Sequence, residues 1–355
     1  MDTVIVYSDK IKNYDFGFGH PFRSDRYANF MRLLREKASD FEIIEPSYAS
    51  DEELLLVHEI RYVEFIEGES KRIWLPSSRF LSPDTPLQPG IGKAARIIAG
   101  SSLKAAELVW EGKFTRAVGV GGGLHHARRN YGAGFCIYND VAICVKNLIQ
   151  KYGLERILIL DTDAHAGDGT CEIFYEDPKV LFIDLHQDPL TLYPGTGFSN
   201  EVGTGDGKGY TVNIPLPPEA SYDAYKYVLE EIFVPLAIEF NPQIIIRNGG
   251  SDPHFADELT NLGLTIEGFQ MIGRKVREAA DIVCNGKVVD LPGSGYNPMV
   301  LPQGWLGFIA GLADLDIKIE EPFFFSLKTD HKLEETKSVA EEVQENLKGY
   351  WKCFS

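Results

Sequence analysis

The sequence predicts an α/β fold in which helices surround one largely parallel β-sheet of about eight strands. Two observations support this prediction. Short apolar runs bounded by polar residues recur along the chain, and such runs are typical of strands buried on both faces. Segments with helical periodicity lie between most of these runs. Since no linker divides the 355 residues, we expect a single domain over residues 1–355.

The run Ile157 to Leu160 is the clearest strand, because four consecutive apolar residues suit the interior of a sheet. The other expected strands have similar apolar cores, ended by glycine, proline or charged residues. In chain order, the expected strands cover residues 4–7, 41–44, 117–120, 157–160, 180–185, 210–214, 243–246 and 288–291.

The expected helices are recognised by an apolar face or by a capping residue. Ala94, Ile97 and Ile98 begin one such face, and Asn139 caps the segment after it. The expected helices cover residues 25–36, 50–55, 60–69, 93–110, 141–151, 170–175, 222–240, 266–283 and 301–312. A C-terminal helix over about 331–351 should pack on the body of the domain through its apolar face. The Pro-rich stretch 75–92 should be irregular and lie at the rim of a site.

The composition limits the possible functions. The net charge of −17 argues against direct nucleic-acid binding, which needs a basic surface. It would favour cationic substrates, and solubility or adaptation to a particular environment explains it equally well. No apolar run is long enough to span a membrane, and the N-terminus does not resemble a signal peptide. The five cysteines include no CxxC pair, which favours a reducing, cytoplasmic setting.

Polar side chains are concentrated directly after the strand at 157–160. Asp163 and His165 are two residues apart, so in an extended segment they project to the same side. A carboxylate and an imidazole are natural ligands for a divalent metal such as zinc. Asp161 and Asp168 remain available to orient nearby imidazoles. The alternative is that these acidic residues merely cap the next helix.

Three other expected strands also end in reactive groups. His125 and His126 follow the strand at 117–120 through three glycines, Asp252 follows 243–246, and Tyr296 follows 288–291. Because ligands of parallel sheets bind beyond the carboxyl ends of the strands, these groups are expected to meet at one edge.

The motifs together resemble those of the zinc-dependent histone deacetylase superfamily, which includes acetylpolyamine amidohydrolases and acetoin-utilisation proteins. The motifs lie in family order at residues 122–127, 134–140, 161–169, 193–197, 250–252 and 295–296, and the resemblance extends from about 20 to 304. It implies an arginase-like, three-layer α/β/α fold. It also implies hydrolysis of an N-acetyl amide, with an acetylated small molecule or an acetyl-lysine protein as the substrate.

The resemblance implies specific metal positions. Asp163, His165 and Asp252 match the ligands of one zinc ion per chain. The backbone around Asp161, Asp163 and His165 matches a potassium site that supports the zinc loop.

The resemblance also implies catalytic and substrate-binding roles. His125 and His126 match the family's histidine pair, supported by Asp161 and Asp168 respectively, and Tyr296 matches the tyrosine that polarises the acetyl carbonyl. The positions expected to line the acyl tunnel are Phe135, Tyr193, Gly134 and Leu259.

Three positions depart from the family pattern. Ala166 replaces a second histidine, Ser294 interrupts a glycine run, and an approximate alignment places Lys93 where many relatives carry an aspartate at the tunnel rim. These departures leave the catalytic set intact but argue against specificity for peptides or histones.

A zinc-dependent deacetylase is the leading prediction. The alternatives are an amidohydrolase acting on a small molecule such as an acetylpolyamine, and a non-catalytic protein that binds acetylated ligands. A binuclear manganese hydrolase would need extra bridging carboxylates near His125 and His126, and the sequence offers none.

Overall fold

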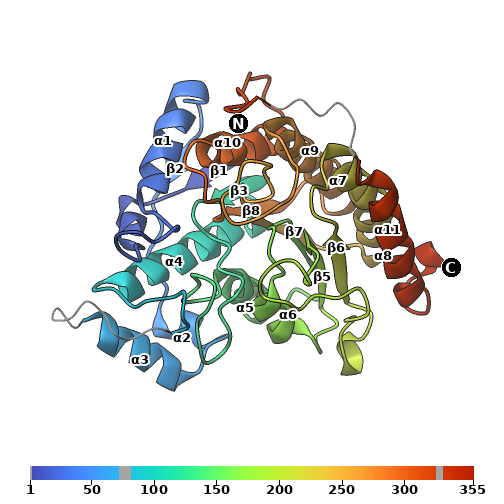
Figure 1. The fold of residues 1–355 in the computed structure, drawn as a ribbon. Helices are drawn as coiled ribbons and strands as arrows, with labels where there is room; N and C mark the ends of the chain where they lie inside the picture. The colour runs from blue at the N-terminus through green and yellow to red at the C-terminus, as the bar shows by residue number, and fades with distance from the viewer. Residues whose placement is uncertain (1, 72–80, 325–330) are drawn as a thin grey trace.

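The computed structural model describes residues 2–71, 81–324 and 331–355. Its centre is an eight-stranded sheet in the order β2-β1-β3-β8-β7-β4-β5-β6, and every neighbouring pair is parallel (Figure 1). The prediction of a largely parallel α/β sheet is therefore confirmed. The strands are β1 (Thr3–Val6), β2 (Ile43–Ile44), β3 (Arg116–Gly119), β4 (Ile157–Asp161), β5 (Val180–Gln187), β6 (Thr211–Leu216), β7 (Ile244–Gly249) and β8 (Val288–Pro292).

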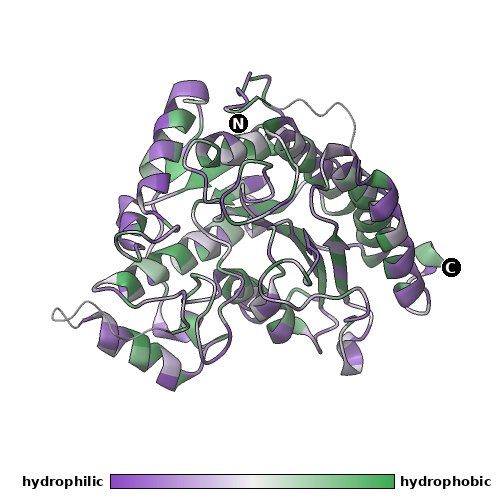
Figure 2. Ribbon diagram, viewed as in Figure 1, coloured by the Kyte–Doolittle hydropathy of each residue, from purple (hydrophilic) through white to green (hydrophobic). Residues whose placement is uncertain are grey.

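Helices cover both faces of the sheet, which gives the three layers expected. Alternate residues of β4 belong to different cores: Ile157 and Ile159 pack on one face, and Leu158 and Leu160 on the other. The first face is covered by α3 (Ile60–Ser70), α4 (Ile91–Trp110), α5 (Asp140–Tyr152) and α6 (Asp168–Phe174). The second face is covered by α7 (Tyr222–Val228), α8 (Val234–Phe240), α9 (Ile266–Val283) and α11 (Leu333–Leu347). Apolar side chains are concentrated on the inner sides of these helices (Figure 2).

Three further helices complete the fold. They are α1 (Asp25–Lys37), α2 (Asp51–Leu54) and α10 (Leu301–Leu312), and α10 packs against both α1 and α9. The C-terminal helix α11 packs on α7 and β6 through Ala340, Val343 and Leu347, as its apolar face predicted. In the expected irregular stretch 75–92, residues 75–80 lie outside the described part of the chain. None of the described helices is long and apolar enough to cross a membrane.

The prediction of one uninterrupted helix over residues 222–240 is wrong. A π-helical turn at Leu229–Phe233 separates α7 from α8. Pro235 lacks a backbone N–H, so it cannot bond the carbonyl of Glu231 as a regular helix would require. The Gln344 side chain of α11 donates to that Glu231 carbonyl instead, at 3.2 Å.

Candidate active site

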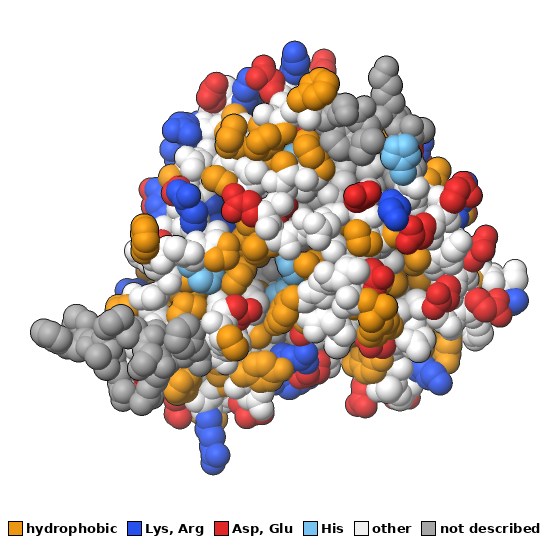
Figure 3. Space-filling view, in the orientation of Figure 1, with side chains coloured by type: hydrophobic (Ala, Val, Ile, Leu, Met, Phe, Trp, Pro, Cys, Tyr) orange, Lys and Arg blue, Asp and Glu red, His pale blue; other side chains and the backbone are white. Residues whose placement is uncertain are grey.

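The predicted reactive groups follow the carboxyl ends of four adjacent strands, β3, β8, β7 and β4. His125 and His126 follow β3, Tyr296 follows β8, Asp252 follows β7, and Asp163 lies just after β4. Figure 3 shows a hollow in this face with histidine surface inside it and hydrophobic side chains around it. Strand order therefore brings together groups that are far apart in the sequence.

Asp163, His165 and Asp252 form a buried trio. Each offers one ligand atom, and these atoms all lie within 4.8 Å of one another. The Nδ1 atom of His165 lies 3.1 Å from Asp163 Oδ1 and 3.1 Å from Asp252 Oδ2. Burial raises the pKa of the Asp252 carboxyl to about 8, and the charge of Asp163 adds to this rise. Two carboxylates held this close inside a protein favour a bound cation.

The two neighbouring histidines each face a carboxylate. His125 Nδ1 lies 2.8 Å from Asp161 Oδ2, and His126 Nδ1 lies 2.7 Å from Asp168 Oδ1. Burial alone would lower the pKa of His125, but the carboxylates around it, chiefly Asp161, raise that pKa to about 10. The pKa of His126 is lowered by burial and by the charge of His125. The pair can therefore hold one proton on His125 while His126 stays neutral.

The glycine turn before the pair is required by close packing. Gly123 has a φ of +102°, and a Cβ there would lie 2.3 Å from the Asn248 side chain. The backbone N–H groups of Gly123 and Leu124 donate to Asp140, which is fully buried. This carboxylate holds the loop that delivers both histidines.

Aromatic rings flank the histidines and the trio. Phe135 makes an edge contact with Tyr296 at 5.6 Å, and Tyr193 makes edge contacts with His126 at 5.1 Å and His165 at 6.5 Å, between ring centroids. At Gly134, with φ +55°, a Cβ would lie 2.3 Å from the His126 ring. Glycine therefore allows this segment to approach the histidine pair.

Tyr296 and Leu259 are held through a shared carboxylate. Asp257 accepts hydrogen bonds from the backbone N–H of Tyr296 at 2.8 Å and of Leu259 at 3.0 Å. The Tyr296 ring lies 6.4 Å from the His165 ring, while the Leu259 side chain is exposed. Tyr296 thus borders the trio. Leu259 lies at the surface, two residues after the Asp257 carboxylate that holds Tyr296.

Three contributing residues were not predicted from the sequence. Asn248, just beyond the expected strand end, donates to Asp161 Oδ2 at 2.7 Å. Arg128 donates to Asp168 Oδ2 at 2.7 Å. Asp184 lies beside Asp161 in the register of β5 and β4, and its Oδ1 atom is paired with His186 Nδ1 at 3.0 Å. The polar position of Asn248 after a strand was a usable signal, but no sequence feature indicated the other two.

The placement of Lys93 at the tunnel rim is wrong. Its Nζ atom lies over the Tyr48 ring, 5.1 Å from the centroid, in a surface recess between α3 and α4. Asp84 and Thr85 lie beside Gly134 and Phe135 instead. Asp84 Oδ1 accepts a hydrogen bond from Gly134 N at 3.3 Å, and Thr85 Oγ1 accepts one from Phe135 N at 3.0 Å. An aspartate, Asp84, therefore lies next to Gly134, whereas Lys93 does not.

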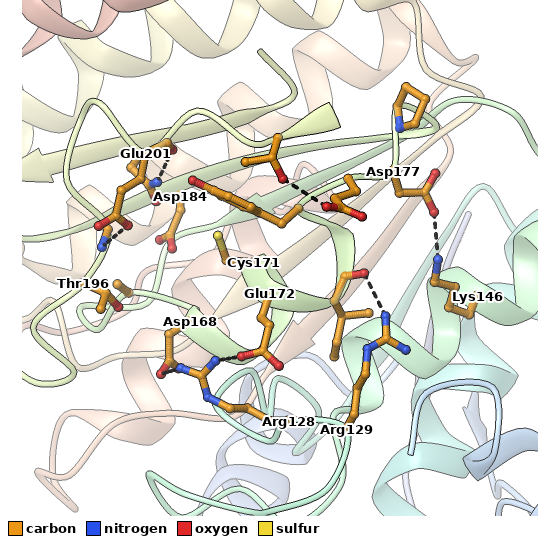
Figure 4. Close-up of a pocket in the computed structure, with 18 residues that line it drawn as sticks. Arg128, Arg129, Lys146, Asp168, Cys171, Glu172, Asp177, Asp184, Thr196 and Glu201 are labelled. Atoms are coloured by element: carbon orange, nitrogen blue, oxygen red, sulfur yellow. Dashed lines mark hydrogen bonds and ion pairs between the residues drawn. The ribbon is translucent and has the colours of Figure 1, made fainter. Parts of the chain in front are cut away.

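A separate cavity of about 750 Å³ is lined by Asp168, the carboxylate that faces His126 (Figure 4). Arg128 bridges Asp168 and Glu172 on one side of it, and Lys146 is paired with Asp177 on another. Ala166 lines this cavity, together with Asp168. Asp168, which faces His126 on one side, therefore also lines a solvent-accessible pocket.

Comparisons with known proteins agree with this geometry. Residues 20–312 match the model of the histone deacetylase domain. The chain is 41% identical to a probable deacetylase of Archaeoglobus fulgidus, over 100% of both chains. It is 37% identical to the acetoin utilization protein AcuC of Bacillus subtilis, covering 86% of this chain and 80% of that protein. A crystal structure of the HDA15 HD domain has the same fold, with a TM-score of 0.87, 24% identity and coverage of 99% and 97%. The chain belongs to the histone deacetylase family.

Proposed function

We propose that the protein is a zinc-dependent deacetylase that hydrolyses the N-acetyl amide of acetyl-lysine or of an acetylated amine. The observation that carries the proposal is the buried trio Asp163, His165 and Asp252 beside the histidine pair and Tyr296. One imidazole and two carboxylates are a donor set that zinc accepts, and three protein ligands leave a position for a reactant.

The trio would hold the metal, and the surrounding residues would handle the proton and the charge. Zinc bound there would supply Lewis acidity, which polarises the amide carbonyl and makes a water molecule more acidic. His126, kept neutral by burial and by His125, would accept the proton of the attacking water. It would then return that proton to the leaving amine as the C–N bond breaks, giving acetate and the free amine.

Tyr296 would donate its hydroxyl proton in a hydrogen bond to the carbonyl oxygen as negative charge develops there. Phe135 and Tyr193 would enclose the flat amide and its aliphatic chain, an apolar arrangement that suits a neutral acyl-amine. All five catalytic candidates, namely His125, His126, Tyr296, Asp161 and Asp168, are retained. This retention favours an enzyme over a protein that only binds acetylated ligands.

A potassium ion at Asp161, Asp163 and His165 would support the zinc loop. The fully buried Asp184 fits this role, since its neighbour in the sheet is Asp161. Its Oδ1 atom is paired with His186 Nδ1 at 3.0 Å, and its Oδ2 atom accepts a hydrogen bond from the backbone N–H of Gly167 at 2.8 Å. We also propose a cytoplasmic location, which the odd number of cysteines supports.

The substrate can be a protein or a small molecule. The charge of −17 and the acidic residues near the rim, Asp84 and Glu258, favour a cationic one. An amidohydrolase acting on acetylpolyamines is therefore the second candidate.

The direct test is to load the purified protein with zinc, count the bound metal, and screen acetyl-lysine peptides, acetylpolyamines and small acetamides for acetate release. We expect one zinc per chain and turnover of at least one class. Asp252→Ala should lose both the metal and the activity. Full zinc occupancy in that variant would refute the assignment of Asp252 as a ligand. If the zinc-loaded protein turned over none of these substrates, the proposal that it is a deacetylase would be refuted.

A further inference from the structure

Ser294, the residue that interrupts the expected glycine run, is hydrogen-bonded to a member of the trio. Its Oγ atom donates to Asp252 Oδ1 at 2.6 Å, and both side chains are buried. The other carboxylate oxygen, Oδ2, lies 3.1 Å from His165 Nδ1. The two oxygens of Asp252 therefore have different partners: Oδ1 accepts from the Ser294 hydroxyl, and Oδ2 faces His165.

The backbone of Ser294 is fixed on two sides. Its carbonyl accepts hydrogen bonds from Trp305 Nε1 at 2.9 Å and from the backbone N–H of Ser251 at 3.1 Å. Trp305 is fully buried. Gly250 permits the approach, because a Cβ there would lie 2.2 Å from the Ser294 hydroxyl and carbonyl oxygens. The hydroxyl is thus presented to Asp252 by a rigid frame.

We propose that Ser294 is a positioning residue for the metal site. Its hydroxyl occupies Asp252 Oδ1 and so reserves Oδ2 for the metal ion. A hydrogen bond from a hydroxyl to an ionised carboxylate is strong and directional, and it limits rotation of that carboxylate. This inference rests on the proposed function, since it assigns Asp252 as a ligand.

The test is a set of zinc affinities measured on metal-free protein by competition with a chromophoric chelator. Ser294→Ala and Ser294→Gly remove the hydroxyl and should weaken zinc binding roughly tenfold or more, the usual effect of losing an outer partner of a metal ligand. Ser251→Ala is the matched control. Ser251 is a fully buried serine adjacent to Asp252 whose hydroxyl makes no hydrogen bond within the described part of the chain, so its loss should change the affinity less than about twofold.

A double-mutant cycle tests whether Ser294 acts through Asp252. In an Asp252→Asn background, Ser294→Ala should have little further effect on zinc affinity, because no anionic carboxylate remains to be oriented. Circular dichroism of each metal-free variant establishes that it is folded before the titration.

The outcomes separate the two proposals. A wild-type protein that does not bind zinc would overturn the proposed function and this inference together. A wild-type protein that binds zinc while folded Ser294→Ala binds it within twofold would overturn the role of Ser294 alone. An equal loss of affinity on Ser294→Ala with and without the Asp252→Asn substitution would also overturn that role.

Discussion

The Nε2 atoms of His125 and His126 lie 3.1 Å apart, close enough for one ring to donate a proton to the other. Only one of the two facing atoms can carry that proton. The carboxylates of Asp161 and Asp163 favour its location on His125. His126 is therefore the ring whose Nε2 atom keeps its lone pair, while its Nδ1 atom faces Asp168.

His126→Ala should keep its bound zinc and lose roughly 10²–10⁴-fold in kcat, the range for removal of a general acid–base group. In the wild type, protonation inactivates His126, and its lowered pKa means that inactivation begins below the ordinary histidine value of about 6.5. The acidic limb of kcat/KM should lie below that pH. Zinc content is measured at each pH. If kcat/KM falls already above pH 6.5 while zinc occupancy is full, His126 is not the proton acceptor.

Tyr296→Phe should fold normally and bind zinc as the wild type does. Its KM should change little, because the ground-state carbonyl is only weakly basic. Its kcat should fall roughly 10²–10³-fold, the cost of losing one oxyanion donor. Steady-state kinetics on one acetylated substrate provide the test, and a near-normal kcat would remove Tyr296 from the catalytic set.

Arg128→Ala should lower kcat roughly tenfold, because Arg128 holds the carboxylate that orients His126. Without the positive charge of Arg128, Asp168 favours protonation of His126 more strongly and the pKa of His126 rises. The fall in activity at acid pH should therefore begin at a higher pH. Arg129→Ala is the matched control, since Arg129 donates to the carbonyl of Ile173 at 3.3 Å. Equal effects of the two substitutions would contradict a specific role for Arg128.

His58 should make the protein sensitive to acid. It is buried between the Arg128 carbonyl and the Asn139 N–H, and burial lowers its pKa to about 4. Between about pH 6.5 and pH 4 the unfolded chain binds a proton on this residue and the folded chain does not. Stability attributable to a neutral His58 is therefore present above pH 6.5 and falls by roughly 3 kcal/mol as the pH drops to 4.

His58→Gln keeps a donor and an acceptor without a titrating ring. Urea unfolding at pH 7 and at pH 4.5 should show a smaller acid-induced loss of the free energy of unfolding in this variant. The same pH dependence in both proteins would show that His58 is not responsible.

Raising the ionic strength should lower kcat/KM for acetylpolyamines, because salt screens the attraction between cationic substrates and the acidic protein. A neutral acetamide provides the control and should respond little. A salt effect of the same size on both substrates would exclude electrostatic attraction as its cause.

The sequence alone was sufficient to predict the sheet and the convergence of the site. Apolar runs such as Ile157 to Leu160 determine buried parallel strands, and parallel strands place their carboxyl ends at one edge. For this reason the sequence predicts that Asp163, Asp252 and Tyr296 lie close together.

Contacts between segments distant in the sequence were decided only by the tertiary structure. No local pattern indicates that Ser294 bonds Asp252, that Arg128 bonds Asp168, or that Asp184 lies beside Asp161. These pairings depend on strand order and loop path, which bring together residues separated by up to 42 positions in these hydrogen bonds. Lys93 was misplaced for the same reason, because the irregular segment before α4 gives no periodicity from which its path can be deduced. Local side-chain chemistry therefore indicated the candidate ligands, whereas long-range packing selected the residues that contact them.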